Sequence, residues 1–244
     1  MHQDRFYIPC TPTTQEVWID GNEAHHIIRV KRAKEGEKIT LFNGKGYEYL
    51  GHIQEILKDK LKVFIEQTHL VDREPPIEIT IAFSVPKGKH STFLIQKCAE
   101  LGVKTLIPLS CERSVVDIGE KSTEKIERWD KIVIEASKQC KRNLLTQIEA
   151  AMPFADFIKT VGSYDLALIA CTETDTITLK KVLHEHQQAK MILCLVGPEG
   201  GFTHNEVIMT KERGCIPVSI GHSTLRIETA AIAISSMLLY AYSG

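Results

Sequence analysis

The chain has 244 residues, of which 43% are hydrophobic and 25% are charged. This hydrophobic content is enough to bury one large core or two modest ones, so we do not expect a disordered protein. A formal net charge of -1 excludes nucleic-acid binding through overall positive charge, so any such contact depends on local clusters of lysine and arginine. The N-terminal residues carry no hydrophobic signal region and no apolar run reaches about 18 residues, so we expect a cytoplasmic protein without a membrane span.

The seven cysteines are odd in number, scattered along the chain and without any Cys-x-x-Cys pair. Most lie in apolar runs, as Cys194 does, where a thiol behaves as a small hydrophobic group. We therefore predict reduced thiols, with neither a disulfide framework nor a bound metal.

Short extended segments separated by turns make up the first 70 or so residues. Asp20-Gly21 and Asn43-Gly44 supply the positive backbone dihedrals of tight hairpin turns, and one helical pattern covers residues 23–30. The pattern predicts a small β-barrel domain over residues 1–72. Its expected strands are 16–19, 38–42 and 60–65.

A linker is expected at residues 73–76, because Pro75 and Pro76 lack backbone donors and hold the chain extended. In the second domain, residues 77–244, apolar strand patterns alternate with helical ones. This alternation predicts an α/β domain with a mostly parallel sheet covered on both faces. The expected strands are 77–85, 105–109, 166–171, 191–196 and 216–220.

Three helices of the second domain have clear signals. Ser122 is a suitable cap for a helix whose apolar residues recur at helical spacing. Thr203 and Glu206 have the spacing of a capping box, and Gly214 is placed to end the helix that they begin. The segment 229–242 is apolar on nearly every face, so we expect it to be buried in the core or against another subunit.

A glycine-rich loop, GPEGGFT over residues 197–203, follows the apolar strand at 191–196. Its three glycines let the backbone approach a ligand closely, and Pro198 stiffens the turn. Taken alone, such a strand-to-helix loop is as often a plain turn as a ligand site. The loop lacks the dinucleotide-binding fingerprint G-x-G-x-x-G, so a Rossmann-type nucleotide site is disfavoured.

A second polar loop, residues 219–226, leads from a strand end into the apolar terminal helix and places Arg226 and Glu228 at its start. Taken alone, the two side chains fit a surface ion pair better than catalysis, with Glu228 favouring the helix N-terminus. An ion pair does not explain why two glycine-bearing loops both follow strand ends. Open α/β sheets usually bind ligands there, which favours a shared site.

Together the two loops resemble signatures of the SPOUT-type 16S ribosomal RNA (uracil-N3) methyltransferases. GPEGGFT with Glu206 is similar to the family's GPEGGFS...E motif, and Leu225-Arg226 with Glu228-Thr229-Ala230 is similar to its LRTETA motif, at the expected separation. The resemblance covers essentially the whole chain. Its supporting matches are Arg5-Phe6-Tyr7, His26 with Arg29-Val30 and Arg32, Phe42-Asn43-Gly44, Lys97 with Glu100-Leu101-Gly102, Pro108, Glu112-Arg113-Ser114 and Gln139.

Three positions depart from the family pattern. Thr224 stands where relatives commonly carry an arginine, which removes a positive charge from the expected mouth of the active site. Ile227 replaces a threonine, and Lys138 replaces a frequent glutamate.

The resemblance implies a PUA-like barrel joined to a SPOUT domain, an α/β fold whose C-terminal part forms a trefoil knot, and a homodimer. It also implies that S-adenosylmethionine binds among three knot loops. The residues it assigns to cofactor binding are Cys171, Thr172, Val196, Gly197, Pro198, Glu199, Gly200, Gly201, Ile220, Gly221, Ser223 and Leu225.

The implied reaction uses a methyl group that is already activated, so the protein needs no metal and no covalent nucleophile, and its main task is to align the reacting atoms. Uracil N3 is protonated at neutral pH, so a proton acceptor or an environment favouring the anion is required. Arg226 is the candidate to stabilise charge developing on a carbonyl oxygen. Glu228 is a candidate proton acceptor, or it orients Arg226.

RNA contact is expected at a basic cluster of the first domain, for which a solvated charged helix face is the alternative. The candidates are His26, Arg29, Lys31 and Arg32 with Arg5 nearby, and Lys87, Arg113 and Arg142 extending the surface across the second domain. Two other functions stay open: a SPOUT enzyme that methylates a ribose hydroxyl, and a noncatalytic RNA-binding relative that has lost turnover.

Overall fold

The computed structural model describes residues 4–116, 122–171 and 176–243. The chain divides into two compact units: unit 1 comprises Met1–Glu74 and Ser137–Leu145, and unit 2 comprises Pro75–Ala136 and Thr146–Gly244. The chain leaves unit 1 within the segment 73–76 that the prolines indicate as a linker. The assignment of residues 137–145 to unit 1 differs from the expected boundaries, because the sequence pattern places this segment in the second domain.

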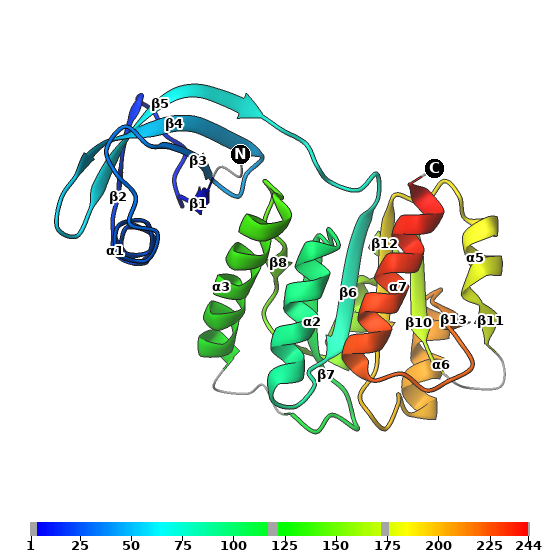
Figure 1. Ribbon diagram of the computed structural model, residues 1–244. Helices are drawn as coiled ribbons and strands as arrows, with labels where there is room; N and C mark the ends of the chain where they lie inside the picture. The colour runs from blue at the N-terminus through cyan, green and yellow to red at the C-terminus, as the bar shows by residue number, and fades with distance from the viewer. Residues whose placement is uncertain (1–3, 117–121, 172–175, 244) are drawn as a thin grey trace. The chain divides into compact units, whose positions relative to one another are not determined.

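Unit 1 is built on a curled five-stranded sheet with the order β1-β3-β4-β5-β2 (Figure 1). β1 pairs with β3 in parallel, and the other pairs are antiparallel. A short helix, α1 (Gly21–His25), continues directly into a π-helix, η1 (His26–Val30). The strands are β1 (Arg5–Tyr7), β2 (Glu16–Ile19), β3 (Lys38–Phe42), β4 (Tyr47–Ile56) and β5 (Leu61–Leu70).

The pairing of β4 with β5 is irregular in two places, and such irregularities bend and twist a strand. Register shifts fall between Leu50 and Gly51 and between Ile53 and Glu55. At Gly51 an added Cβ would lie 2.2 Å from the backbone oxygen of Phe64, so a glycine is required for the strands to approach this closely. All five strands and both helical segments contribute to one apolar core, through residues such as Phe6, Val17, Ala24, Ile27, Leu41, Ile53 and Leu61.

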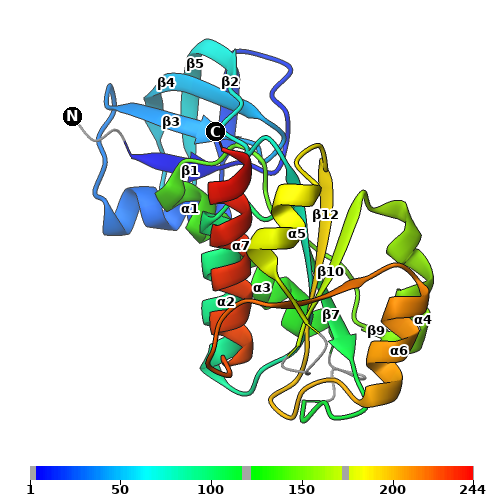
Figure 2. The same cartoon turned by 90° about the vertical axis from the view of Figure 1, so that its right-hand side faces the viewer.

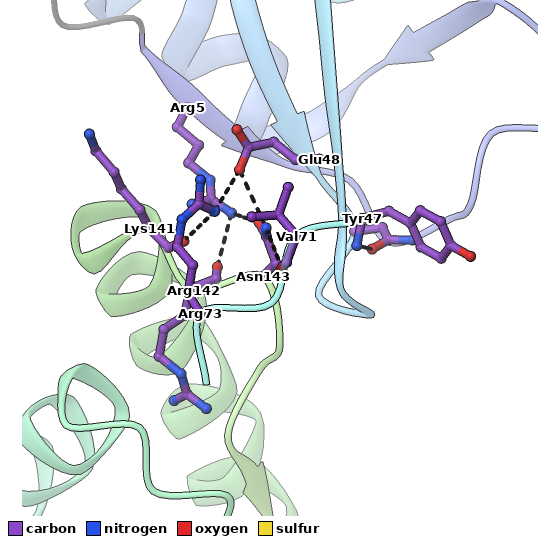
Figure 3. Close-up of polar contacts among 9 residues, drawn as sticks. Arg5, Tyr47, Glu48, Val71, Arg73, Lys141, Arg142 and Asn143 are labelled. Atoms are coloured by element: carbon purple, nitrogen blue, oxygen red, sulfur yellow. Dashed lines mark hydrogen bonds and ion pairs between the residues drawn. The ribbon is translucent and has the colours of Figure 1, made fainter. Parts of the chain in front are cut away.

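Arginines and carboxylates hold residues 137–145 within unit 1. The buried Arg142 guanidinium donates to both carboxylate oxygens of Glu74. Arg5 donates from Nη2 to the backbone oxygen of Arg142 at 2.9 Å and to Oδ1 of Asn143 (Figure 3). The Arg5 guanidinium also lies 4.1 Å from the centroid of the Phe42 ring, and burial lowers its pKa to about 10, so it stays charged at neutral pH.

A second carboxylate completes this network. Glu48 accepts hydrogen bonds from Arg73 Nη1 at 2.8 Å and from Asn143 Nδ2 at 3.3 Å (Figure 3). The Asn143 amide also donates to the backbone oxygen of Val71 at 3.1 Å. These bonds tie residues 137–145 to the end of β5 and to β4, which explains why the segment belongs to unit 1.

Unit 2 contains an eight-stranded sheet in which every described strand pair is parallel. The order is β11-β13-β10-β12-β6-β7-β8, and β9 also pairs with β7. The central strands are apolar along almost their whole length, as strands covered on both faces are. The strands are β6 (Glu78–Ser84), β7 (Thr105–Ser110), β8 (Gln147–Ile148), β9 (Met152–Pro153), β10 (Leu166–Ala170), β11 (Ile177–Thr178), β12 (Met191–Val196) and β13 (Ile216–Ser219).

Helices cover both faces of this sheet (Figure 2). On one face lie α2, α7 and α3, and Trp129 of α3 contacts the ring of Phe83 on β6. On the other face, α4, the 3-10 helix η2 and α6 bury Phe157, Val161 and Val207 against β7, β10 and β12. The helices are α2 (Lys89–Glu100), α3 (Ser122–Cys140), α4 (Phe154–Phe157), η2 (Ile158–Ser163), α5 (Leu179–Glu185), α6 (His204–Glu212) and α7 (Ile227–Tyr242).

The structure confirms the α/β class of the second domain and the separate β domain before it. The capping box of Thr203 and Glu206 is present at the start of α6, and Gly214, with φ 86°, follows its end. The prediction that the terminal helix is buried in the core or against another subunit is not tested by a single chain. α7 is not buried all round within this chain, because Met237 and Tyr240 are exposed, the latter to 89%.

Within the described ranges, no helix is long and apolar enough to cross a membrane. The same residues include no group of three or more His, Cys, Asp or Glu side chains able to hold a metal ion. None of the seven cysteines, all of which lie in the described ranges, forms a disulfide. Burial raises the pKa of Cys98 and of Cys215 to about 12, so these thiols stay protonated at neutral pH.

Candidate functional site

Three neighbouring strands of unit 2 end level with one another. Ala170, the last residue of β10, lies opposite Val196 at the end of β12 and opposite Val218 of β13. Because the strands are parallel, the segments that follow them leave from the same edge of the sheet. The 197–203 loop and the 219–226 loop, far apart in the sequence, are therefore neighbours in the fold.

A cavity of about 410 Å³ lies between these loops, a size typical of small-molecule sites. The structure brings together at this cavity every described residue that the resemblance assigns to cofactor binding, while Thr172 lies outside the described residues. These are Cys171, Val196, Gly197, Pro198, Glu199, Gly200, Gly201, Ile220, Gly221, Ser223 and Leu225. The cavity is also lined by residues outside this assigned set: Arg113, Ala170, Phe202, Val207, Ser219, Thr224, Ile227 and Ala230.

Glu206 fixes the shape of the 197–203 loop. Its buried carboxylate accepts a hydrogen bond from the backbone N–H of Thr203 at 2.8 Å and another from the backbone N–H of Glu112 at 2.9 Å. The capping carboxylate therefore links the glycine-rich loop to the segment that follows β7. Burial, together with the Glu206 charge, raises the pKa of the neighbouring Cys111 thiol to about 12, which leaves it unreactive.

Arg113 also joins these two segments. Its Nη1 donates to the backbone oxygen of Gly200 at 2.9 Å, and the side chain lines the cavity. The sequence interpretation places Arg113 on an RNA surface, whereas the structure places it in the wall of the cavity. No periodic pattern in the sequence predicts that Arg113 contacts the glycine-rich loop. Arg113 follows β7 and the loop follows β12, and β6 lies between these two strands in the sheet.

The two candidate catalytic residues, Arg226 and Glu228, flank the cavity without lining it. Arg226 is the exposed residue before α7, between Leu225 and Ile227, both of which line the cavity. Glu228 is buried, and its Oε1 lies 2.9 Å from Nδ1 of His90 at the start of α2. The polar partner of Glu228 is therefore His90, and among the described residues Arg226 and Glu228 form no ion pair with each other.

Most of the basic cluster predicted for RNA contact is exposed on unit 1. Arg29, Lys31 and Arg32 follow one another closely at the end of the π-helix, and all three are exposed. Lys31 pairs with Asp4 at 2.7 Å, and Arg32 has φ 54°, which is uncommon for a residue with a side chain. The ring of His26 is half-buried against Phe6.

The other predicted RNA contacts have different surroundings. Lys87 is exposed in the loop between β6 and α2. Arg142 is only 4% exposed and holds Glu74, and two nitrogens of Arg5 are buried, so neither guanidinium is presented as a surface for phosphate. The structure therefore gives both residues hydrogen bonds that hold unit 1 together, whereas the sequence interpretation expects both to contact RNA.

Comparison with known proteins defines the class. A model of the RNA methyltransferase domain matches residues 73–239, a range that covers nearly all of unit 2. A model of the RNA methyltransferase PUA domain matches residues 19–66. The chain therefore contains the two domains of an RNA methyltransferase, with the PUA domain before the methyltransferase domain.

Comparison with individual relatives narrows this class to one family. The ribosomal RNA small subunit methyltransferase E of Bacillus subtilis is 32% identical over 227 residues, which cover 91% of this chain and 89% of the relative. A methyltransferase of Legionella pneumophila, solved with the bound cofactor S-adenosylmethionine, is 32% identical with a TM-score of 0.91, and the match covers 99% of this chain and 98% of that one. The ribosomal RNA small subunit methyltransferase E of Neisseria gonorrhoeae, bound to S-adenosylmethionine, is 29% identical with a TM-score of 0.90 and the same coverage. The chain belongs to the ribosomal RNA small subunit methyltransferase E family.

Proposed function

We propose that this protein transfers a methyl group from S-adenosylmethionine to N3 of a specific uridine in the 16S RNA of the small ribosomal subunit. The observation that carries the proposal is the cavity of unit 2, formed by the loops that bear the family's two signatures, in a chain related over nearly its whole length to small-subunit methyltransferases. The trefoil knot that the resemblance implies stays a prediction.

The residues of the cavity fit the methyl donor. Phe202, Leu225 and Ile227 supply apolar wall that suits an adenine ring, and the glycines expose backbone groups to its polar edge. A Cβ added to Gly221 would meet no heavy atom within 4 Å, so open space adjoins this backbone. The bound donor supplies the activated methyl group, and the protein holds it in line with the acceptor nitrogen.

We assign the chemistry of the acceptor to the two residues that flank this cavity, Arg226 and Glu228. Arg226, exposed beside the lining residue Leu225, stabilises the negative charge that develops on a uracil carbonyl oxygen. Glu228 accepts the N3 proton, and His90, at 2.9 Å, orients its carboxylate. This arrangement favours a proton acceptor over the alternative in which Glu228 orients Arg226, because Glu228 is paired with His90.

RNA affinity is assigned to His26, Arg29, Lys31 and Arg32 of unit 1, with Lys87 of unit 2 as a further contact. We predict that Arg29→Ala combined with Arg32→Ala weakens RNA binding and lowers its salt dependence by about one unit of slope for each lost phosphate contact. Donor affinity should stay at the wild-type value, because both residues belong to unit 1 and the cavity to unit 2. Fluorescence anisotropy over a series of salt concentrations measures the slope.

The matched control for this pair is Lys58→Ala combined with Lys60→Ala, which removes two exposed charges from the β4–β5 turn of the same unit. The control should leave the slope unchanged. An equal loss in both double variants would indicate a general charge effect and would contradict a specific role of Arg29 and Arg32 in RNA binding.

We also propose a homodimer in the cytoplasm, where a ribosomal RNA substrate is found. Its support is the exposed face of α7, since Met237 and Tyr240 are apolar side chains left uncovered within one chain. A second subunit covering this face would meet the expectation that the terminal helix is buried on nearly every side.

The proposed function is tested by incubating the protein with labelled S-adenosylmethionine and unmodified small ribosomal subunits, then digesting the RNA to nucleosides for mass spectrometry. The proposal expects one labelled base-methylated uridine. A label on ribose identifies a 2'-O-methyltransferase instead, and donor binding without any transfer identifies a noncatalytic relative.

A further inference from the structure

Charge is sparse around the cavity. Arg113 and Glu199 are the two charged side chains among the described residues that line it. The methyl donor of the proposed function carries an ammonium, a sulfonium and a carboxylate. Glu199 complements the two cations, but the carboxylate also loses hydration on entering the site and needs a partner of its own.

Arg113 is held where it can serve as that partner. Its base is anchored because the preceding residue, Glu112, donates its backbone N–H to Glu206 at 2.9 Å. Its tip is anchored by the Nη1 bond to the Gly200 backbone oxygen at 2.9 Å. Its Cδ would lie 3.5 Å from a Cβ added to Gly200, so the side chain runs along the glycine-rich loop.

Within the described ranges, the bond to Gly200 is the one hydrogen bond of the Arg113 side chain, which leaves most of its donor capacity unused. A guanidinium has five N–H donors in a fixed planar fork, which matches the two oxygens of a carboxylate. Because the Arg113 side chain is held at both ends, its guanidinium is in place before the ligand arrives, and little side-chain entropy is lost on binding.

We infer that Arg113 binds the carboxylate of the methionyl part of the methyl donor. The inference rests on the proposed function and adds a cofactor-binding residue to it. It replaces the RNA contact expected for Arg113 from the sequence, since a guanidinium bonded to Gly200 belongs to the wall of the cavity.

The test compares three ligands by calorimetry: S-adenosylmethionine, its decarboxylated analogue, and 5'-methylthioadenosine, which lacks both the amino and the carboxyl group. Wild type should prefer S-adenosylmethionine over the decarboxylated analogue by roughly tenfold, as expected for one charge-assisted pair. Arg113→Gln should abolish this preference and leave the affinity for 5'-methylthioadenosine unchanged. Arg113→Lys should keep part of the preference, because it retains the charge but loses the fork.

Arg213→Gln is the matched control, because it removes an exposed arginine of unit 2 that does not line the cavity, and it should retain the full wild-type preference. The inference is overturned if Arg113→Gln keeps the preference, if wild type shows none, or if 5'-methylthioadenosine binding falls as much as donor binding. These outcomes leave the proposed function standing. If wild type binds none of the three ligands, the proposed function fails as well.

Discussion

Arg226→Ala is expected to lower the single-turnover rate of methyl transfer by roughly a hundredfold or more, as for the loss of one preorganised oxyanion donor, with little change in donor affinity. Arg226 adjoins two lining residues, Leu225 and Ile227, and is therefore close to the reacting atoms. Because it does not itself line the cavity, its loss should change donor affinity little. Its side chain is exposed and has no hydrogen bond or ion pair among the described residues, so its loss should not destabilise the fold. Thr224 provides no second positive charge nearby.

Rapid-quench measurements with saturating RNA separate this effect from RNA binding. Arg226→Lys should recover only part of the rate, because it keeps the charge but loses the planar fork. Arg213→Ala, an exposed arginine of the same unit, serves as the control and should react at the wild-type rate. Near wild-type transfer by Arg226→Ala would show that the residue acts in binding alone, and the stabilising role would have to be assigned elsewhere.

Arg142→Met is expected to have the opposite profile, a large loss of stability without a specific loss of chemistry. The variant leaves the Glu74 carboxylate, 19% exposed, without its bidentate partner. Removing one partner of a buried ion pair typically costs about 3 to 5 kcal/mol, and the low end applies because Glu74 retains some solvent. We therefore expect unit 1 to lose about 3 kcal/mol.

Urea unfolding monitored by fluorescence measures this loss. The chain has two tryptophans, Trp18 in unit 1 and Trp129 in unit 2, so a Trp129→Phe background makes Trp18 the reporter of unit 1. Lys31→Met, which breaks an exposed pair with Asp4, is the control and should cost less than about 1 kcal/mol. A midpoint for Arg142→Met equal to that of this control would show that the pair with Glu74 does not stabilise unit 1.

The strands and the two loops of the site were predictable because their signals are local. The apolar run at 191–196 corresponds to β12 residue for residue, and the capping box of Thr203 and Glu206 begins α6. The order of the sheet is not local information. The adjacency of β10, β12 and β13 places the 197–203 and 219–226 loops around one cavity, and no sequence spacing reports it.

Charged residues were the least predictable part of the site, because a sequence gives their type but not their partner. Arg142 is of the residue type expected to contact RNA, yet it is buried against Glu74 in unit 1. Glu228 has the position of a helix-start carboxylate paired with Arg226, yet it pairs with His90, which lies 138 residues earlier in the chain. The helix-like pattern at 23–30 indicated a helix but not its π-helical second half, which no periodic signal distinguishes.

The central claim, that the cavity between the strand-end loops of unit 2 binds the methyl donor, is tested most directly by titrating S-adenosylmethionine calorimetrically into Gly200→Val beside Gly162→Val. Neither glycine has a positive φ, and added Cβ atoms meet only ordinary contacts, 3.5 Å to Arg113 at Gly200 and none within 4 Å at Gly162. Both variants should therefore fold. Gly200→Val, which places a side chain at the cavity, should weaken binding by more than about tenfold, whereas Gly162→Val, on η2 away from the cavity, should bind as wild type does. Equal affinities in the two folded variants would contradict the assignment of this cavity.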